Sequence, residues 1–131
     1  MATNAHVYLR THQLRGRLLR FGLADEGAEL SRKAAATAAG RAAKTLVKEG
    51  ALRITQVALR KGTALPSHQV DGPASVQVLR GKLRVTTASG ELDLAPGALI
   101  AINAGIAHSA MALSDCVILI TIAMPEARPA A

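Results

Sequence analysis

Two histidines in this sequence have the chemistry to bind a metal ion or to orient a small ligand. His68 stands shortly before an Asp-Gly-Pro turn, and His108 lies in the alternating segment AHSAMAL. A neutral imidazole ligates transition metals, and its pKa near neutrality also suits a general acid or base. Either use requires partner groups nearby, so the residues at fixed spacings from each histidine decide between them.

The first histidine lies inside a pattern bounded by glycines. Five residues separate Gly62 from His68, and Val70 stands two positions beyond the histidine. Three residues then separate Val70 from Ala74, and six separate Ala74 from Gly81. Neither a valine nor an alanine side chain can ligate a metal, so this spacing carries only one candidate ligand.

A second pattern surrounds the other histidine. Five residues separate Gly97 from Asn103, and Gly105 stands two positions further on. Two residues separate Gly105 from His108, and three separate His108 from Ala112. The second pattern again supplies a single histidine among small and apolar residues.

In order and in spacing, these positions resemble the two sequence motifs of the cupin superfamily. The first motif is Gly, five residues, His-x-His, three or four residues, Glu, six residues and Gly; the second is Gly, five residues, Pro-x-Gly, two residues, His, three residues and Asn. The matching positions are Gly62, His68, Gly81, Gly97, Gly105 and His108. The positions that depart are Val70, Ala74, Asn103 and Ala112. The resemblance covers about residues 42–123 and implies an all-β fold, a cupin jelly-roll β-barrel with a short N-terminal helical extension.

The departures bear on the metal site that the resemblance implies. In cupins the motifs supply three histidines and one glutamate to a metal inside the barrel. Only His68 and His108 remain here, with Val70 and Ala74 at the other two positions. A divalent transition metal needs about three or four nitrogen or oxygen ligands to bind well. We therefore expect no cofactor, or a divalent transition metal held weakly by the two histidines, and we expect all four residues to line a ligand-binding pocket.

The remaining polar side chains nearby are not expected to complete the ligand set. By strand alternation Gln77 lies on the face opposite to Ala74, and Ser109 and Met111 point away from the face of His108. Asp71 is interpreted as a turn residue. Cys116 begins an apolar strand and is interpreted as a small core residue.

The chain divides into three predicted parts. Residues 1–41 form a basic, partly helical extension, residues 42–124 form the barrel domain, and residues 125–131 form a tail. The segment 24–40 is alanine-rich, with acids early and bases late, which predicts a helix that ends at Gly40.

After this helix the apolar residues recur with a period of two, which is typical of β-strands. Short runs separated by Gly, Pro, Asn or Asp at intervals of about 8 to 12 residues indicate an all-β sandwich or barrel. The predicted strands are 42–48, 52–60, 75–81, 82–88, 90–97, 98–103, 107–113 and 116–123. The last run has no alternation, which predicts burial on both faces.

The net charge of +7 is concentrated near the N-terminus. The first 24 residues contain four arginines (Arg10, Arg15, Arg17 and Arg20) and no acid. Such a segment suits a nucleic-acid arm, a contact with an anionic membrane, a transit peptide or a solvated extension. Because aromatics make up 2% of the chain and a helix-turn-helix pattern is missing, we expect a solvated extension and no sequence-specific reading of nucleic acid. His6 and His12 in this extension are interpreted as surface residues.

Composition limits the compartment and the partners. A single cysteine excludes an intramolecular disulfide, and the sequence contains neither an apolar run long enough to cross a bilayer nor a secretory h-region. We therefore expect a cytoplasmic protein with no membrane partner. A hydrophobic content of 50% in one small barrel also favours a homodimer.

Three functions are compatible with the sequence. The first is a small cupin that binds a small organic molecule of unknown identity in the barrel, with a degenerate or absent metal site. The second is a cupin enzyme of the oxygenase, isomerase or lyase type, with a weakly held metal at His68 and His108. The third is a structural or interaction module that uses its basic N-terminal half. The fold does not specify a reaction, so enzymatic activity is left open.

Overall fold

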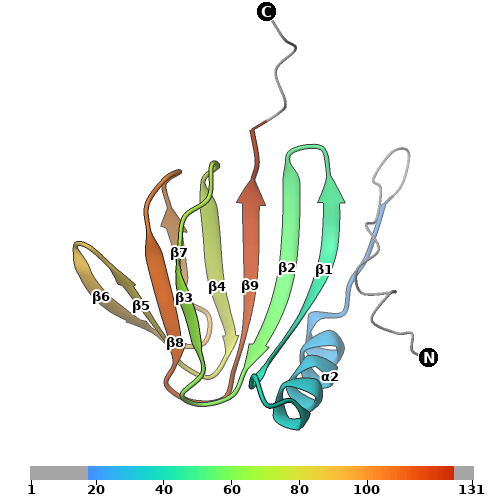
Figure 1. The fold of residues 1–131 in the computed structure, drawn as a ribbon. Helices are drawn as coiled ribbons and strands as arrows, with labels where there is room; N and C mark the ends of the chain where they lie inside the picture. The colour runs from blue at the N-terminus through green and yellow to red at the C-terminus, as the bar shows by residue number, and fades with distance from the viewer. Residues whose placement is uncertain (1–17, 126–131) are drawn as a thin grey trace, which may run out of the picture.

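The computed structural model describes residues 18–125, which form one helix and nine strands in two facing sheets (Figure 1). The elements are α2 (Leu23–Ala36), β1 (Arg41–Glu49), β2 (Leu52–Leu59), β3 (Ala64–His68), β4 (Ala74–Arg80), β5 (Leu83–Thr87), β6 (Gly90–Leu94), β7 (Leu99–Ile102), β8 (His108–Ala112) and β9 (Cys116–Ala123). Most of the predicted arginine-rich segment, with His6 and His12, lies outside the described residues, as do residues 126–131 of the predicted tail.

Both sheets are antiparallel. The larger sheet has the strand order β1-β2-β9-β4-β7, and the smaller sheet has the order β3-β8-β5-β6. Their inner faces share one core cluster, to which Val57, Val78 and Ile118 contribute from the larger sheet and Leu83 and Val85 from the smaller. This is the jelly-roll sandwich that the string of short alternating strands predicts.

The strand predictions agree with the structure except at one place. Every predicted strand is present, with ends within a few residues, but β3 was not predicted. This five-residue strand contains Pro66, which cannot donate to a strand ladder. Proline is tolerated here because β3 lies at the edge of the smaller sheet and pairs only with β8.

The helix α2 covers the outer face of the larger sheet over β1 and β2, as Figure 1 shows at the lower right. Leu30 and Ala34 of the helix pack on Ala58 and Val117 in a second apolar cluster. An ion pair of 2.8 Å between Lys44 Nζ and a Glu26 carboxylate oxygen also joins β1 to the helix.

The predicted end of this helix at Gly40 is wrong. The helix stops at Ala36, and its C-cap Thr37 is already extended, with φ −107° and ψ 149°. The Thr37 hydroxyl accepts a hydrogen bond from the backbone N–H of Gly40 at 3.2 Å, which favours a turn at this point. Gly40 has a φ of +70° and leads directly into β1.

The prediction that the run 116–123 is buried on both faces holds only for its first half. Cys116, Val117 and Ile118 are buried, whereas the next four residues are half-buried. The apolar cluster beneath α2 includes Val117 and no later residue of β9. The helix therefore covers the outer face of β9 only near its start.

Across residues 18–125, no helix has the length and apolar character needed to span a membrane.

Candidate functional site

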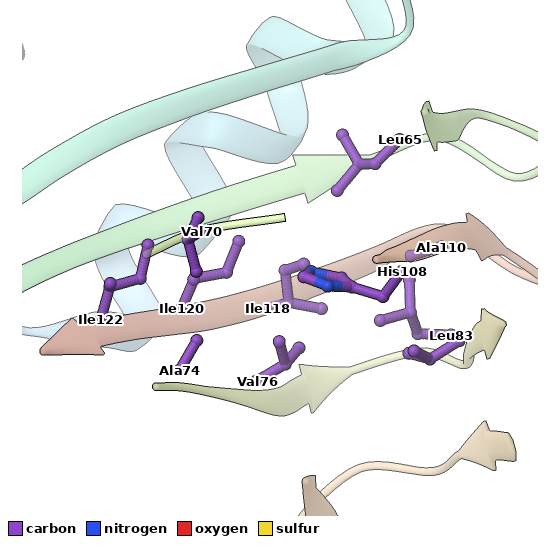
Figure 2. Close-up of a pocket in the computed structure, with 11 residues that line it drawn as sticks. Leu65, Val70, Ala74, Val76, Leu83, His108, Ala110, Ile118, Ile120 and Ile122 are labelled. Carbon is purple, nitrogen blue, oxygen red and sulfur yellow. The ribbon is translucent and has the colours of Figure 1, made fainter. Parts of the chain in front are cut away.

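A small pocket lies between the two sheets, and Figure 2 shows the side chains that form it. Its walls come from β3, β4, β5, β8 and β9 and from the connection between β3 and β4. The lining residues are Leu65, Val70, Ala74, Val76, Leu83, Val85, His108, Ala110, Ile118, Ile120 and Ile122. Among these described side chains, His108 is the one polar group.

The structure brings three of the four sequence-predicted site residues to this pocket. Val70, Ala74 and His108 lie on its walls. Val70 and Ala74 lie at the end where β9 finishes in Ile122, whereas His108 lies nearer Ile118 and Ala110 (Figure 2). The backbone of His68 pairs directly with that of His108 in the ladder between β3 and β8. The side chain of His68 lies outside the described part of the structure, so its role remains a prediction.

Strand alternation places the β4 residues of the site. Ala74, Val76 and Val78 are buried, while Ser75, Gln77 and Leu79 between them are half-buried on the other face. The alternation correctly placed Gln77 away from the pocket. Ser109 and Met111 on β8 likewise do not line the pocket.

Val70 is held in place although it belongs to no strand. Its carbonyl oxygen accepts a hydrogen bond of 2.8 Å from the N–H of Gly105, which ties the connection to the loop before β8. Two residues later the chain packs closely on the end of β9, and a Cβ on Gly72 would overlap the carbonyl oxygen of Ala123. Glycine is therefore required at position 72 if Val70 is to keep its place.

The glycines that match the motifs act on the backbone. Gly62, before β3, has a φ of +84°, and Gly105, before β8, has a φ of +77°. Residues other than glycine rarely adopt a positive φ. These turns position the backbones of β3 and β8, and they do so whatever side chain stands at 70 or 74.

His108 is buried, with 8% of its surface exposed. Its Nδ1 lies 3.0 Å from the carbonyl oxygen of Ile106. Because a carbonyl can only accept a hydrogen bond, Nδ1 carries the proton in this contact. The contact orients the imidazole.

The donor set of the pocket does not fit the metal that the cupin motifs imply. Among the described side chains of residues 18–125, which do not include that of His68, no group of three or more His, Cys, Asp or Glu could hold a metal ion. The positions that would supply a second histidine and a glutamate carry Val70 and Ala74, and both point into the pocket as part of its apolar wall. Two imidazoles alone would leave most of the coordination sphere to water.

Cys116 belongs to the core, as its sequence context predicted. Its side chain lies in the cluster between the sheets. Burial, with a smaller contribution from the nearby Asp115 carboxylate, raises the pKa of the Cys116 thiol to about 11. The thiol is therefore neutral near pH 7 and is not a ready ligand or nucleophile.

Most of the pocket wall was not singled out from the sequence. Ile118, Ile120 and Ile122 alternate along β9 and face the pocket, but the unbroken apolar run around them hides this period. On β5 and β8 the signal was present, because Leu83 with Val85 and Ala110 with His108 are separated by two positions. Combining the face of His108 with the period of its strand would have identified Ala110.

Solved structures resemble this chain closely in fold. A conserved protein of unknown function from Streptococcus pyogenes is 32% identical, with a TM-score of 0.63 over 66% of this chain and 76% of that one. A cupin superfamily protein from Desulfitobacterium hafniense has a TM-score of 0.63 at 15% identity, over 65% of this chain and 78% of that one. A salicylate 1,2-dioxygenase from Pseudaminobacter salicylatoxidans has a TM-score of 0.65 at 16% identity, over 76% of this chain but 33% of that one.

The two facing antiparallel sheets, with the two motif histidines paired across β3 and β8, have the fold of these cupin structures. The chain therefore has a cupin jelly-roll fold. No protein-family model and no curated protein sequence matches it.

Proposed function

We propose that this protein binds a small organic molecule in the barrel pocket and does not depend on a tightly held metal. The observation that carries the proposal is the composition of the pocket wall, which is aliphatic apart from His108. Ligand sites are commonly apolar cavities with a few polar groups that fix the ligand's orientation. An aliphatic wall around one oriented imidazole is such an arrangement.

The size of the pocket limits what can enter. Its volume is about 30 Å³, whereas sites for drug-sized ligands are roughly 300–1,000 Å³. A cavity of this size holds one or two waters or the end of an alkyl group. The ligand therefore places a short apolar end inside the barrel. Any larger part of it remains outside the end of the pocket formed by Ala74 and Ile122, which we call the mouth.

His108 supplies the one polar contact among the described lining side chains. The rest of the wall offers only van der Waals contacts, so a polar group of the ligand is placed either beside this imidazole or outside the pocket.

The alternative is a cupin enzyme with a weakly bound metal at His68 and His108. The direct backbone pairing of the two histidines across β3 and β8 supports it, as does the likeness in fold to a salicylate 1,2-dioxygenase. The loss of two of the four motif ligands, at Val70 and Ala74, favours the first proposal.

The test is a titration with 1-butanol, followed by the methyl resonances of the isotope-labelled protein. We expect saturable shifts at Ile118, Ile120 and Ile122, because these methyl groups face the pocket. The variant Ala74→Leu should abolish the shifts by filling the pocket, whereas Ala35→Leu, at an exposed position of α2, should leave them unchanged. Shifts that are absent, or that survive Ala74→Leu, would contradict a ligand site in the barrel.

A further inference from the structure

The inner face of the larger sheet changes character beside the pocket mouth. At the mouth, Ile122 of β9 pairs on one side with Ala74 of β4 and on the other with Arg53 of β2. Arg53 in turn pairs with Lys48 of β1. Directly opposed residues of an antiparallel ladder share one face, so the two cations stand in the same row as two residues of the pocket wall.

The next row along the sheet repeats this change. Ile120 pairs with Val76 on one side and with Thr55 on the other, and Thr55 pairs with Thr45. In these two rows the β4–β9 side of the inner face is therefore aliphatic, and the β1–β2 side carries hydroxyls and cations. Only the first half lies against the smaller sheet in the core cluster, apart from Val57 and Leu59 near the closed end.

An open groove borders the pocket. It has a volume of about 430 Å³ and is lined by Arg41, Ala42, Ala43, Val57, Leu65 and Ile120. Leu65 and Ile120 also line the pocket, so the two spaces adjoin at these side chains. Arg53 lines neither space and borders the pocket through its register with Ile122.

Among the described residues, no carboxylate pairs with the two cations at the mouth. Within residues 18–125, neither Arg53 nor Lys48 forms an ion pair. Glu49 follows Lys48 on β1 and by alternation belongs to the opposite face, and Asp71 lies exposed in the connection between β3 and β4. The row therefore presents positive charge to anything that leaves the mouth.

Arg53 is also oriented. Its Nη1 donates a hydrogen bond of 2.9 Å to the carbonyl oxygen of Gly50 in the β1–β2 turn. A guanidinium has five N–H donors in a planar fork that matches the two oxygens of a carboxylate. One hydrogen bond to the turn holds the group while other donors remain for a ligand.

We propose that the ligand of the barrel pocket is a small organic carboxylate, with a short alkyl end inside the pocket and its carboxylate at Arg53. Lys48 adds attraction as a second, more mobile charge. This inference rests on the proposed function, because it names the chemical class of the molecule that the pocket binds. It assigns to Arg53 a specificity role that neither cupin motif includes.

The experiment compares butanoate with 1-butanol, which share an alkyl chain and differ in charge. In the natural protein we expect butanoate to bind at least about tenfold more tightly, since a hydrogen bond to a charged group contributes about 1.5–3 kcal/mol. Arg53→Gln should remove this preference and leave the affinity for 1-butanol unchanged. Arg53→Lys should restore part of it, because the charge returns without the planar fork.

The matched control is Arg60→Gln, which removes the same charge just beyond the other end of β2. This variant should keep the full preference for butanoate. Equal affinities for the two molecules in the natural protein, or an equal loss in both glutamine variants, would overturn the carboxylate proposal while leaving the pocket intact. Failure of both molecules to bind would overturn the pocket as well.

Discussion

The two faces of the larger sheet use small residues for opposite purposes. On the outer face, Gly27 of α2 lies so close to the sheet that a Cβ there would stand 3.0 Å from Gln56 Nε2 and 3.2 Å from a Val117 methyl carbon. On the inner face, Ala74 borders the pocket, which Ala110 of the smaller sheet also lines. At Gly27 the missing side chain allows the helix to pack closely on the sheet. At Ala74 the small side chain leaves a space, because no element packs against it.

On the inner face, the two sheets are kept from closing over Ala74 by side-chain packing further along the sandwich, away from the mouth. Val78, Leu83 and Ile118 are at most 1% exposed and meet between the sheets. These large side chains hold the sheets apart, so the small residues nearer the mouth are not closed over. The outer face is therefore a place of structural packing, and the inner face is a place with room for a ligand.

The largest difference is expected for truncation of a large side chain. Leu30→Ala, beneath the helix at 1% exposure, should lower the free energy of unfolding by about 3 kcal/mol or more. Ile122→Ala, at the half-buried pocket mouth, should cost about 1 to 2 kcal/mol. Urea denaturation measures both values, and equal losses would show that the two faces are packed alike.

A metal site can be introduced on the inner face. Val70→His together with Ala74→Glu restores the motif ligands on a backbone that the motif glycines still shape. At a metal concentration 100 times the dissociation constant, binding adds about 2.7 kcal/mol, which raises the melting temperature by roughly 10 °C. Calorimetry in added Mn²⁺, Ni²⁺ or Zn²⁺ should show this rise in the double variant and little change in the natural protein. A rise of similar size in the natural protein would mean that its own side chains already complete a site.

Adding volume should separate the faces again, by a smaller amount. Gly27→Val forces a side chain between the helix and the sheet and should cost about 1 to 3 kcal/mol. Ala74→Val adds less bulk at the pocket, so we expect a change within about 0.5 kcal/mol and weaker binding of 1-butanol. If Ala74→Val proved as destabilising as Gly27→Val, the space beside Ala74 would not exist in solution.

The smallest effect is expected at Cys116, whose thiol should not react with alkylating reagents in the native protein. The raised pKa keeps the thiol protonated at about pH 8, and the core covers it. Iodoacetamide should therefore label the native protein only as fast as it unfolds, and label the urea-denatured protein readily. Mass spectrometry of both samples measures this. Rapid labelling of the folded chain would place Cys116 at an accessible surface.

Much of this fold was predictable because most strands show an alternation of apolar and polar residues within a few positions of sequence. The alternation of Ala74, Val76 and Val78 predicted both the strand β4 and its inward face. The short strand β3 was missed because Pro66 masks it, and only its position at a sheet edge makes that proline acceptable. The helix end was misplaced because the Thr37 cap stops the helix before the more conspicuous glycine.

Only those site residues that belong to a motif with fixed spacing could be predicted from the sequence. The motif offsets identified Val70, Ala74 and His108, which the structure brings to one pocket. Arg53 could not be identified in this way, because its place beside Ile122 depends on the register between two strands far apart in sequence. Pairing of that kind is set by the whole sheet and leaves no signal in a single stretch of residues.

Elemental analysis of the natural protein, purified without a metal-affinity tag and dialysed against metal-free buffer, tests most directly whether the barrel is a ligand pocket and not a metal centre. We expect far less than one Mn, Fe, Ni or Zn per chain, with the same content in the His108→Ala variant. About one transition metal per chain, lost when His68 or His108 is replaced by alanine, would contradict the proposed function and show that other ligands complete the site.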